Sequence, residues 1–598
     1  MKGFYNRILI IDLTTQDFEA RGISDSLIET CLGGKGLASY LLLKNNPPGV
    51  DPLSHKNCLI IATGPVTGSL IWGSSRYGLF TKSPQTGLYS ESYAGGRVPE
   101  AIDAAGYDAV VIKGKSHRLI VLEITPDRVS FHNAEDLKGL STYETENRVK
   151  ERFGIPPKGW KSGCIVIGPA GENRVRFSVV ENDYWRSAGR TGTGAVMGSK
   201  GIKAIVFNGN RKRRVYDPKA IKALARRTAQ EGRDSDSAMS YKKFGTPSMV
   251  RLTNQAKAFP SRYWSEGTTP HWTNITAEAL HEKCQVKPHA CLKCFLACGR
   301  LSTILQGPHA GLTIEGPEYE TIFAFGGLCC VEGIEEIAYL NDICDRLGID
   351  TISAGNLCAF AIEAGLRKRI DLNIEYGDVE GIADLLHKIA FRQGIGEVLA
   401  MGVRHAAHVW ELEDLAVHVK GLEPPGYDPR VLKGVGLGYA VSDRGACHLR
   451  GTFHKAELSG MIDPDVVEEK AALFIDFEDR LTLLDALILC RFYRDLYPWE
   501  VLGDIVHGLT GLDADRPFLT RTAGTISDNV RHFNIREGLT RKDDTLPMRF
   551  HKEELKTGHV ITEKELAYMV DDYYRLRGWD KEGRPLKGSS RTTNPSRS

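Results

Sequence analysis

The run Cys291-Leu-Lys-Cys294-Phe-Leu-Ala-Cys298 places three thiols close together, and a fourth candidate thiol, Cys490, follows far downstream. A C-x2-C-x3-C group with one distant cysteine supplies the four thiolates that a cubane iron–sulfur cluster requires. The spacing therefore predicts a [4Fe–4S] cluster and a chain that moves electrons. It also predicts a fold that brings residue 490 next to residues 291–298.

A zinc site is the main chemical alternative, because thiolates at these spacings also suit tetrahedral zinc. Structural zinc usually pairs two short-range motifs, and the sequence has no second C-x2-C. Radical S-adenosylmethionine enzymes use three close cysteines in the opposite order, with the wider gap first. Cys284 is a weaker candidate than Cys490 for the fourth ligand, and spacing alone does not choose between them.

Composition limits the class of protein. A chain of 598 residues is too long for one hydrophobic core, so we expect about two to four domains. A formal charge of +2, from 77 basic and 75 acidic residues, gives no long-range field for nucleic acid or an anionic membrane. Thirteen scattered cysteines and the absence of a long apolar run predict a reducing compartment, the cytoplasm.

The pattern of elements changes along the chain. The N-terminal part is rich in glycine and in short β-type runs, at Arg7–Leu13, Cys58–Ala62, Ala109–Ile112, Leu119–Ile124, Gly163–Ile167 and Ala204–Phe207. Helical periodicity follows, at Pro218–Glu231, Ile334–Leu347, Val379–Gln393, Val466–Asp479 and Glu563–Leu576. We expect an α+β protein with a β-rich domain at 1–214 and two mostly helical domains at 215–418 and 419–598. The polar tail 587–598 is predicted to be disordered.

Two short segments resemble each other. Asp345-Arg-Leu-Gly-Ile-Asp350 and Asp485-Ala-Leu-Ile-Leu-Cys490 each sit at the end of a helix-like segment, Ile337–Leu347 and Arg480–Leu489 respectively. One such segment alone is an ordinary helix end. As a pair, with one ending in the distant cysteine, they predict two similar binding sites for two copies of one ligand.

Glycine-rich turns are a second source of ligand contacts. They lie at 33–36, 93–97 and 188–194, and such turns let backbone N–H groups approach anionic oxygens. Arginines near these turns add cationic donors, namely Arg76, Arg97, Arg186 and Arg190. The last turn lacks the context of a dinucleotide fingerprint, and each turn by itself is more often a tight β-turn.

Taken together, these features resemble the aldehyde:ferredoxin oxidoreductase family. The further matching motifs are Gly-Pro-Glu-Tyr-Glu at 316–320 and Arg-Gly-Ala-Cys-His-Leu-Arg at 444–450, and the resemblance runs from Asn6–Leu13 to Asp571–Trp579. It implies a tungsten bis-pterin, with molybdenum as the alternative metal, one [4Fe–4S] cluster and Mg2+ bridging the pterin phosphates. It also implies a homodimer, and ferredoxin or an iron–sulfur subunit as partner.

The resemblance assigns roles to particular positions. Asp345 and Asp485 would each accept hydrogen bonds from the N–H edge of one pterin, as an ionised carboxylate can. The other positions that would contact the cofactor are Arg76, Tyr93, Gly95, Arg186, Gly189, Arg190, Ile349, Asp350, Arg450 and Leu489. The cluster ligands would be Cys291, Cys294, Cys298 and Cys490.

Two residues resemble the family's active-site groups, Glu320 and His448, with Glu318 as a less favoured alternative to Glu320. A carboxylate can activate water or take a proton, and an imidazole can polarise a carbonyl oxygen. Tyr427 is a candidate pocket residue. The family's Glu-x-x-His iron motif reads Glu336-Ile-Ala-Tyr339 here, so an iron atom at a subunit interface is in doubt.

Three functions follow as hypotheses. The first is oxidation of a small aldehyde to a carboxylic acid, with electrons passing to ferredoxin. The second is a catalytic subunit of a larger low-potential reductase acting on an acid or an aromatic acyl thioester. The third, from another class, is a non-catalytic iron–sulfur electron-transfer subunit.

Overall fold

The computed structural model describes residues 1–157, 159 and 161–586, so the predicted disordered tail lies outside the described residues. Two mixed six-stranded sheets form in the N-terminal part. The first has the order β2 (Asp17–Gly22), β1 (Arg7–Asp12), β6 (Ala109–Lys113), β3 (Leu59–Ala62), β4 (Tyr77–Lys82) and β5 (Tyr89–Ala94). The second has the order β11 (Arg186–Ala188), β10 (Val180–Asn182), β9 (Ser162–Val166), β12 (Ile202–Asn208), β7 (Ile120–Ile124) and β8 (Val129–Asn133).

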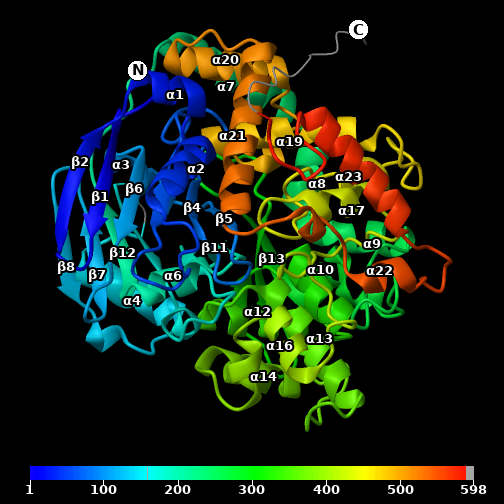
Figure 1. Ribbon diagram of the computed structural model, residues 1–598. Coiled ribbons are helices and arrows are strands. Elements are labelled where there is room, and N and C mark those ends of the chain that lie inside the picture. The colour runs from blue at the N-terminus through cyan, green and yellow to red at the C-terminus, as the bar shows by residue number, and fades with distance from the viewer. Residues whose placement is uncertain (158, 160, 587–598) are drawn as a thin grey trace.

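The two sheets share one apolar core. In β1, Leu9 and Ile11 belong to this shared core, while the alternate residues Ile8 and Ile10 belong to the cluster on the other face, as the two-residue period of a strand requires. Helices α3 (Val98–Ala104) and α6 (Thr193–Ser199) contribute to the core between the sheets. Helices α2 (Gly34–Asn45) and α4 (Thr142–Arg152) cover the outer faces of the first and second sheets. Figure 1 shows this part in blue and cyan beside the helical remainder.

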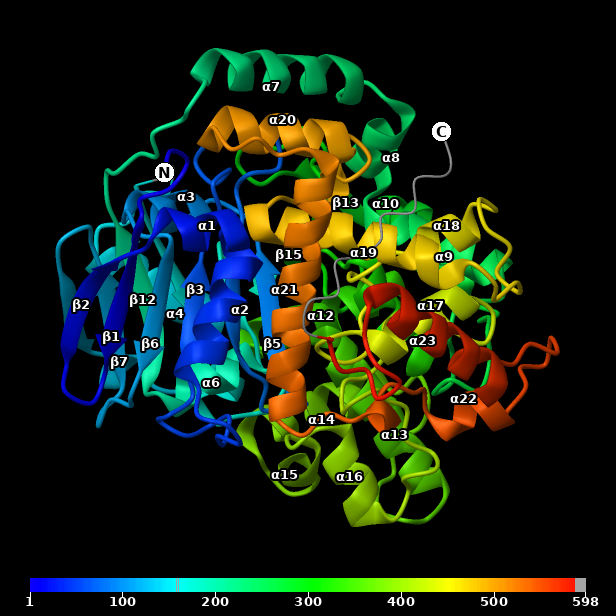
Figure 2. The ribbon, with the colours of Figure 1, turned by 45° about the horizontal axis from the view of Figure 1, so that its top comes forward.

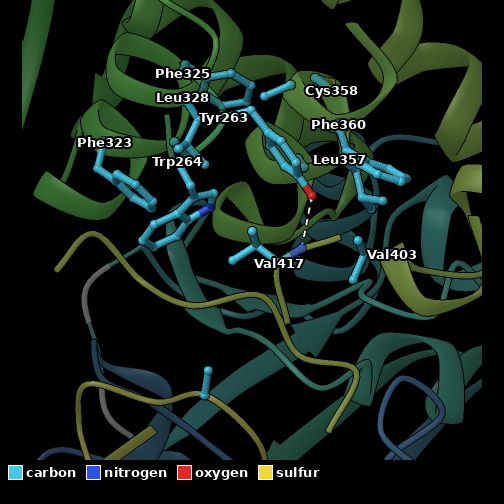
Figure 3. Close-up of a cluster of buried hydrophobic side chains, with 14 of the residues drawn as sticks. Tyr263, Trp264, Phe323, Phe325, Leu328, Leu357, Cys358, Phe360, Val403 and Val417 are labelled. Atoms are coloured by element: carbon cyan, nitrogen blue, oxygen red, sulfur yellow. Dashed lines mark hydrogen bonds between the residues drawn. The ribbon is translucent and has the colours of Figure 1, made fainter. Parts of the chain in front are cut away.

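The helical remainder has a large core of its own. Its principal helices are α12 (Ile334–Leu347), α13 (Thr351–Leu366), α14 (Val379–Phe391) and α16 (Val403–Trp410). Figure 3 shows part of the core, where aromatic rings from several segments pack together and the Val417 N–H donates to Tyr263 Oη at 3.1 Å. A small sheet of β13 (Cys284–His289), β14 (Gly299–Ile304) and β15 (Thr313–Glu315), which the sequence did not predict, lies at one edge.

A second group of helices joins this core to the first sheet. It consists of α7 (Pro218–Gly232), α19 (Lys470–Leu487), α20 (Trp499–Thr510), α21 (Arg516–Arg536) and α23 (Glu563–Arg577). Helix α21 packs against both α19 and α2, as Figure 2 shows in orange and blue. Shorter helices complete the fold: α1 (Asp25–Cys31), α5 (Pro169–Glu172), α8 (Asp236–Phe244), α9 (Met249–Gln255), α10 (Ala277–Lys283), α11 (Tyr319–Thr321), α15 (Ile395–Leu399), α17 (Lys433–Val441), α18 (His454–Leu458) and α22 (Met548–Lys552).

The predicted α+β class is confirmed, with a β-rich N-terminal region and a largely helical remainder. Two local predictions were wrong. The segments 466–479 and 480–489 are one helix, α19, because no glycine or proline interrupts residues 470–487. The glycine run at 33–36 begins α2 instead of forming a β-turn. Within the described part of the chain, no helix is long and apolar enough to cross a membrane.

Candidate active site

A cavity of about 310 Å³ lies between the N-terminal sheets and the helical part. All four predicted cluster cysteines line it, so the structure brings Cys490 to residues 291–298. The cavity is also lined by several of the predicted cofactor residues, namely Arg76, Tyr93, Gly95, Arg186, Gly189, Asp345, Ile349 and Asp350, and by Glu318 and Glu320. The roles of these residues remain predictions, but their convergence on one space is a property of the fold.

One glycine from the N-terminal part holds the two cysteine segments together. The N–H of Gly73 donates to the Lys293 carbonyl at 2.8 Å, and the N–H of Cys490 donates to the Gly73 carbonyl at 2.9 Å. Gly73 has a φ of +80°, and an added Cβ would lie 2.6 Å from the ring of Tyr493. Glycine is therefore needed here both for its backbone conformation and for space.

Tyr493 strengthens this junction. Its hydroxyl accepts the N–H of Phe295 at 2.9 Å and donates to the sulfur of Cys294 at 3.5 Å. Across the cavity, Arg76 Nη1 lies 3.9 Å from the Cys490 sulfur and its Nη2 donates to the Tyr93 carbonyl at 3.3 Å. The thiol segment is thus tied to donors from both the sheet and the helical part.

The four thiols border one shared space. Among the described residues, no three His, Cys, Asp or Glu side chains converge on one position for a metal ion, although the four thiols line a common cavity. An added Cβ at Gly95 would lie 2.7 Å from the Cys291 sulfur, so the backbone leaves that thiol room. Cys284, the other fourth-ligand candidate, is buried at the start of β13 in a separate apolar core and does not line the cavity.

Burial, with smaller contributions from Cys490 and Cys291, raises the pKa of the Cys294 thiol to about 11. Burial also raises the pKa of Cys298 well above its usual value. A bound metal would displace the protons of these thiols into the solvent, which couples metal binding to proton release.

The first acidic segment lies at the wall of the cavity. Asp345 is in the last turn of α12, and its Oδ2 accepts the side-chain N–H of Asn341 at 2.7 Å. Burial raises the pKa of Asp345 well above its usual value, and Glu181 and Asp342 raise it further. Asp345 has no cationic partner among the residues described, so N–H donors of a ligand would complete its hydrogen bonding.

The second acidic segment has a different environment. Asp485 accepts Nη1 of Arg450 at 3.0 Å and also pairs with Arg491. Burial opposes its ionisation, but Arg491, Arg450 and Lys35 outweigh burial and lower its pKa. Asp485 and Arg450 line a second cavity of about 20 Å³, and Leu489 is buried without lining either space. The predicted twin sites therefore do not form one continuous cavity here.

The backbone of the two segments nevertheless repeats. The N–H of Ile349 donates to the Cys344 carbonyl at 2.9 Å, and the N–H of Leu489 donates to the Leu484 carbonyl at 2.7 Å. Each is the residue after a left-handed helix end, at Gly348 or Ile488. The similarity seen in the sequence is therefore a repeated helix-ending turn.

Each of these turns packs against one N-terminal sheet. An added Cβ at Gly64 would lie 2.1 Å from the Leu487 carbonyl oxygen, and one at Gly168 would lie 2.4 Å from the Leu347 carbonyl oxygen. Gly64 and Gly168 each follow a strand and precede a proline, in β3–Thr-Gly-Pro and β9–Ile-Gly-Pro. The sequence analysis missed these two glycines, although the repeated Gly-Pro after a strand was a usable signal.

The predicted catalytic pair lies beside the cavity. Glu320 Oε2 accepts the N–H of Gly426 at 2.9 Å, while Oε1 lies 3.7 Å from Nε2 of His448 and has no hydrogen-bond partner among the described residues. Burial raises the pKa of Glu320 to about 7. Glu320 lies in α11, and a π-helical segment, η4 (Ile322–Leu328), begins directly after that helix.

His448 is neutral in this environment, because burial lowers its pKa well below the usual value and His454 and Arg190 lower it further. His454 was missed by the sequence analysis. Its ring stacks on the candidate pocket residue Tyr427 with 4.0 Å between ring centroids. Burial and Arg494 lower the pKa of His454 to about 3, so both imidazoles are uncharged donors and acceptors at neutral pH.

Arginines connect this pair to the rest of the cavity. Arg190 donates to the carbonyls of Glu423 and Ala446, the latter at 3.2 Å, and Arg186 pairs with Glu315. Arg190 does not line the cavity itself, whereas its neighbour Gly189 does.

Two further positions have structural partners. Glu318, the alternative to Glu320, accepts the hydroxyl of Thr246. At the doubtful iron motif, Glu336 accepts Nε2 of His309 at 2.8 Å, and Tyr339 stacks on His309 with 4.0 Å between ring centroids.

Two family models match the chain. "Aldehyde ferredoxin oxidoreductase, N-terminal domain" matches residues 8–209, and "Aldehyde ferredoxin oxidoreductase, domains 2 & 3" matches residues 223–592. The chain is 36% identical to the tungsten-containing aldehyde ferredoxin oxidoreductase of Thermococcus kodakarensis and 35% identical to that of Pyrococcus furiosus, each over 98% of both chains.

More distant proteins share the fold. The chain is 28% identical to the WOR-like subunit of the aliphatic sulfonate oxidoreductase of Pyrococcus furiosus, over 98% of this chain and 96% of that one. A solved structure of the active site complex BamBC of benzoyl coenzyme A reductase, with 1,5-dienoyl-CoA, superposes with a TM-score of 0.84 at 24% identity, over 98% and 96% of the two chains. On the family models and the full-length relatives, the chain is an oxidoreductase that belongs to the aldehyde ferredoxin oxidoreductase family.

Proposed function

We propose that this chain oxidises an aldehyde to a carboxylic acid with water, using a tungsten bis-pterin and one [4Fe–4S] cluster, and passes the electrons to ferredoxin. The observation that supports this most strongly is one cavity lined by four cysteines and by Glu320, with His448 3.7 Å from that carboxylate. The full-length relatives named as tungsten-containing aldehyde ferredoxin oxidoreductases support the metal and the substrate class.

The bound cofactor would accept two electrons from the aldehyde and release them singly to the cluster. Cys291, Cys294, Cys298 and Cys490 would hold the cluster, and Asp345, with Asp350 at the start of α13, would hold one pterin. Arg76, between the Cys490 sulfur and the Tyr93 carbonyl, would contact both groups.

The protein's own groups handle the protons. Conversion of an aldehyde and water to a carboxylic acid releases two protons and two electrons, so a nearby base is needed. A pKa of about 7 lets Glu320 take a proton at Oε1 and give it up again near neutral pH, while the Gly426 N–H fixes its other oxygen. His448, being neutral, can donate a hydrogen bond to the aldehyde oxygen without adding a full charge.

The test is metal analysis of protein grown with tungstate, followed by aldehyde oxidation with a dye and with ferredoxin as acceptors. We expect about one tungsten and about four iron atoms per chain, with aldehyde-dependent reduction of both acceptors. Zinc in place of iron, or a loaded protein inert toward short aliphatic, aromatic and phosphorylated aldehydes, contradicts the proposal.

The fold shared with the BamBC complex gives a second candidate, a low-potential reductase subunit acting on an aromatic acyl thioester. It predicts that the protein purifies with an iron–sulfur subunit and that the isolated chain leaves aldehydes unreacted. Aldehyde oxidation by the purified chain alone, with ferredoxin as the acceptor, excludes this candidate.

A further inference from the structure

A further cavity, which shares no lining residue with the thiol cavity, combines several cationic groups. It has a volume of about 460 Å³. Five separate segments form it, and the residues lining it are Pro52, Pro84, Gln85, Thr86, Gly87, Arg176, Met401, Gly402, Arg404, His405, His408 and Gly421. We call it the α16 cleft. Among these residues there are two arginines and two histidines, and no carboxylate.

The arginines of the α16 cleft have no protein partner. Nε of Arg176 is buried without a hydrogen bond, and no ion pair of Arg176 or Arg404 occurs among the residues that the structure describes. Elsewhere in the fold the buried arginines Arg213 and Arg577 each contact two carboxylates. Arg404 is exposed and Arg176 is half-buried, so the unmet hydrogen bond is that of the one buried Nε of Arg176, which an anion in the cleft would accept.

The end of a helix adds backbone donors at the same place. Helix α16 (Val403–Trp410) begins at Gly402, which lines the cleft, has a φ of +87° and makes no side-chain cap. The first N–H groups of a helix have no partner within it, and the helix dipole favours negative charge there. Arg404 and His405 belong to this first turn, so their side chains and the free N–H groups share one location.

The electrostatic environment agrees with this geometry. Burial lowers the pKa of Arg176, Arg392 and Arg404 lower it further, and Asp51 acts in the opposite direction. Burial also lowers the pKa of His405, with Arg176 and His408 acting in the same direction. The cationic groups therefore repel one another, and an anion between them would relieve that repulsion.

We propose that the α16 cleft is a binding site for the phosphate group of a small phosphorylated molecule. Planar guanidinium groups and helix N-termini both suit a phosphate dianion. A volume of about 460 Å³ exceeds what a phosphate ion alone would fill, and Pro52, Pro84 and Met401 provide apolar wall for an organic part. This proposal does not depend on the redox function of the other cavity.

The site also shares a residue with the environment of the first acidic segment. Gln85 lines the cleft, and its Nε2 donates to Glu423 at 2.8 Å. The same Glu423 accepts the hydroxyl of Ser353 at 2.7 Å, and the N–H of Ser353 donates to Asp350 at 3.0 Å. A ligand in the cleft would therefore lie next to Gln85, which is linked through Glu423 and Ser353 to Asp350 at the cofactor cavity.

The test is calorimetric titration of the purified full-length protein with glycerol phosphate, inorganic phosphate and acetate at matched ionic strength. We expect glycerol phosphate and inorganic phosphate to compete for one site per chain, and acetate to bind at least about tenfold more weakly, because it bears a single charge. Arg176→Gln and Arg404→Gln should each weaken phosphate binding about tenfold, since each removes a charge-assisted hydrogen bond.

Arg367→Gln is the matched control, because Arg367 is an exposed arginine that pairs with Glu363 on α13. Its phosphate affinity should equal that of the unmodified protein. Arg404 is exposed at the rim, so Arg404→Gln keeps the test valid should Arg176→Gln misfold. Equal phosphate affinity in Arg404→Gln and in the control, no saturable binding, or acetate binding as tightly as phosphate would each overturn the proposal.

Discussion

Oε1 of Glu320 and Nε2 of His448 lie 3.7 Å apart, which is too long for a direct hydrogen bond. Oε1 of Glu320 and Nδ1 of His448 also have no hydrogen-bond partner among the described residues. Buried polar atoms without partners are uncommon, and here they belong to a carboxyl and an imidazole next to one cavity. The pair is therefore arranged to bind a third group placed between or beside them.

His448→Ala should lower kcat/KM for aldehyde oxidation by about 10²- to 10⁴-fold, because it removes the neutral donor for the carbonyl oxygen. Tungsten and iron contents should not change, since the thiols and the acidic segments are intact. His387→Ala, on the exposed side of α14, is the control and should keep full activity. Full turnover in His448→Ala would remove His448 from the mechanism.

Glu320 should give the enzyme a pH dependence near neutrality. Burial raises its pKa to about 7, so the carboxyl ionises near that pH and can then accept a proton. The value of kcat/KM should therefore rise with pH up to about 7 and level off above it. Glu320→Gln should abolish both this rise and most of the activity. Glu318→Gln is the comparison, and a pH profile lost in Glu318→Gln but kept in Glu320→Gln would reverse the assignment.

The same pKa has a consequence for stability. The folded Glu320 keeps its proton between the ordinary value of 4.5 and about 7, where the unfolded chain has lost it. The free energy of unfolding should therefore decrease as pH rises through that range, and Glu320→Gln should show a smaller decrease. Denaturant titrations of both proteins at several pH values measure the difference, and parallel curves would show that Glu320 ionises normally.

Cys490→Ser and Cys284→Ser form a matched pair for the fourth cluster ligand. Cys490→Ser should lose most of the iron and the visible cluster absorbance, because its sulfur lines the same cavity as the other three thiols. Cys284→Ser should keep both, since Cys284 is buried in the other core. Iron loss in Cys284→Ser alone would make it the ligand instead.

Gly64→Ala should destabilise the protein by about 1–3 kcal/mol, the usual cost of overpacking. Its new methyl group would lie 2.1 Å from the Leu487 carbonyl oxygen, which forms part of the turn that follows Asp485. Gly22→Ala is the control, because nothing lies within 4 Å of an added Cβ there. Thermal unfolding of the two variants compares them directly, and equal midpoints would mean that the contact at Gly64 relaxes freely.

The features that could be predicted from the sequence are those marked by a pattern within a short stretch of residues. The cysteine spacing, the two acidic segments and the β-to-helical change each occupy short windows, and the structure contains the corresponding elements. The division of α19 at residue 479 was wrong, because residues 481–487 are all buried and this half of the helix has no amphipathic period to join it to the first.

Apart from the approach of Cys490 to residues 291–298, the contacts that join distant segments were not predicted. The stacking of His454 on Tyr427 and the position of Gly73 depend on how elements far apart in the chain come to lie against one another. A single histidine or glycine has no periodic neighbour to mark its role.

The position of Gly73 affects the order in which the protein matures. Its N–H and carbonyl fasten the strand-rich beginning of the chain to residues 293 and 490, so the fourth thiol reaches the others only after synthesis has passed that point. A four-thiol cluster would then be completed late, after the chain has formed its contacts of longest sequence separation. Such contacts are the slow ones in folding. A nascent chain truncated before residue 490 should therefore present only three of the four cysteine sulfurs, and its cluster site should be incomplete.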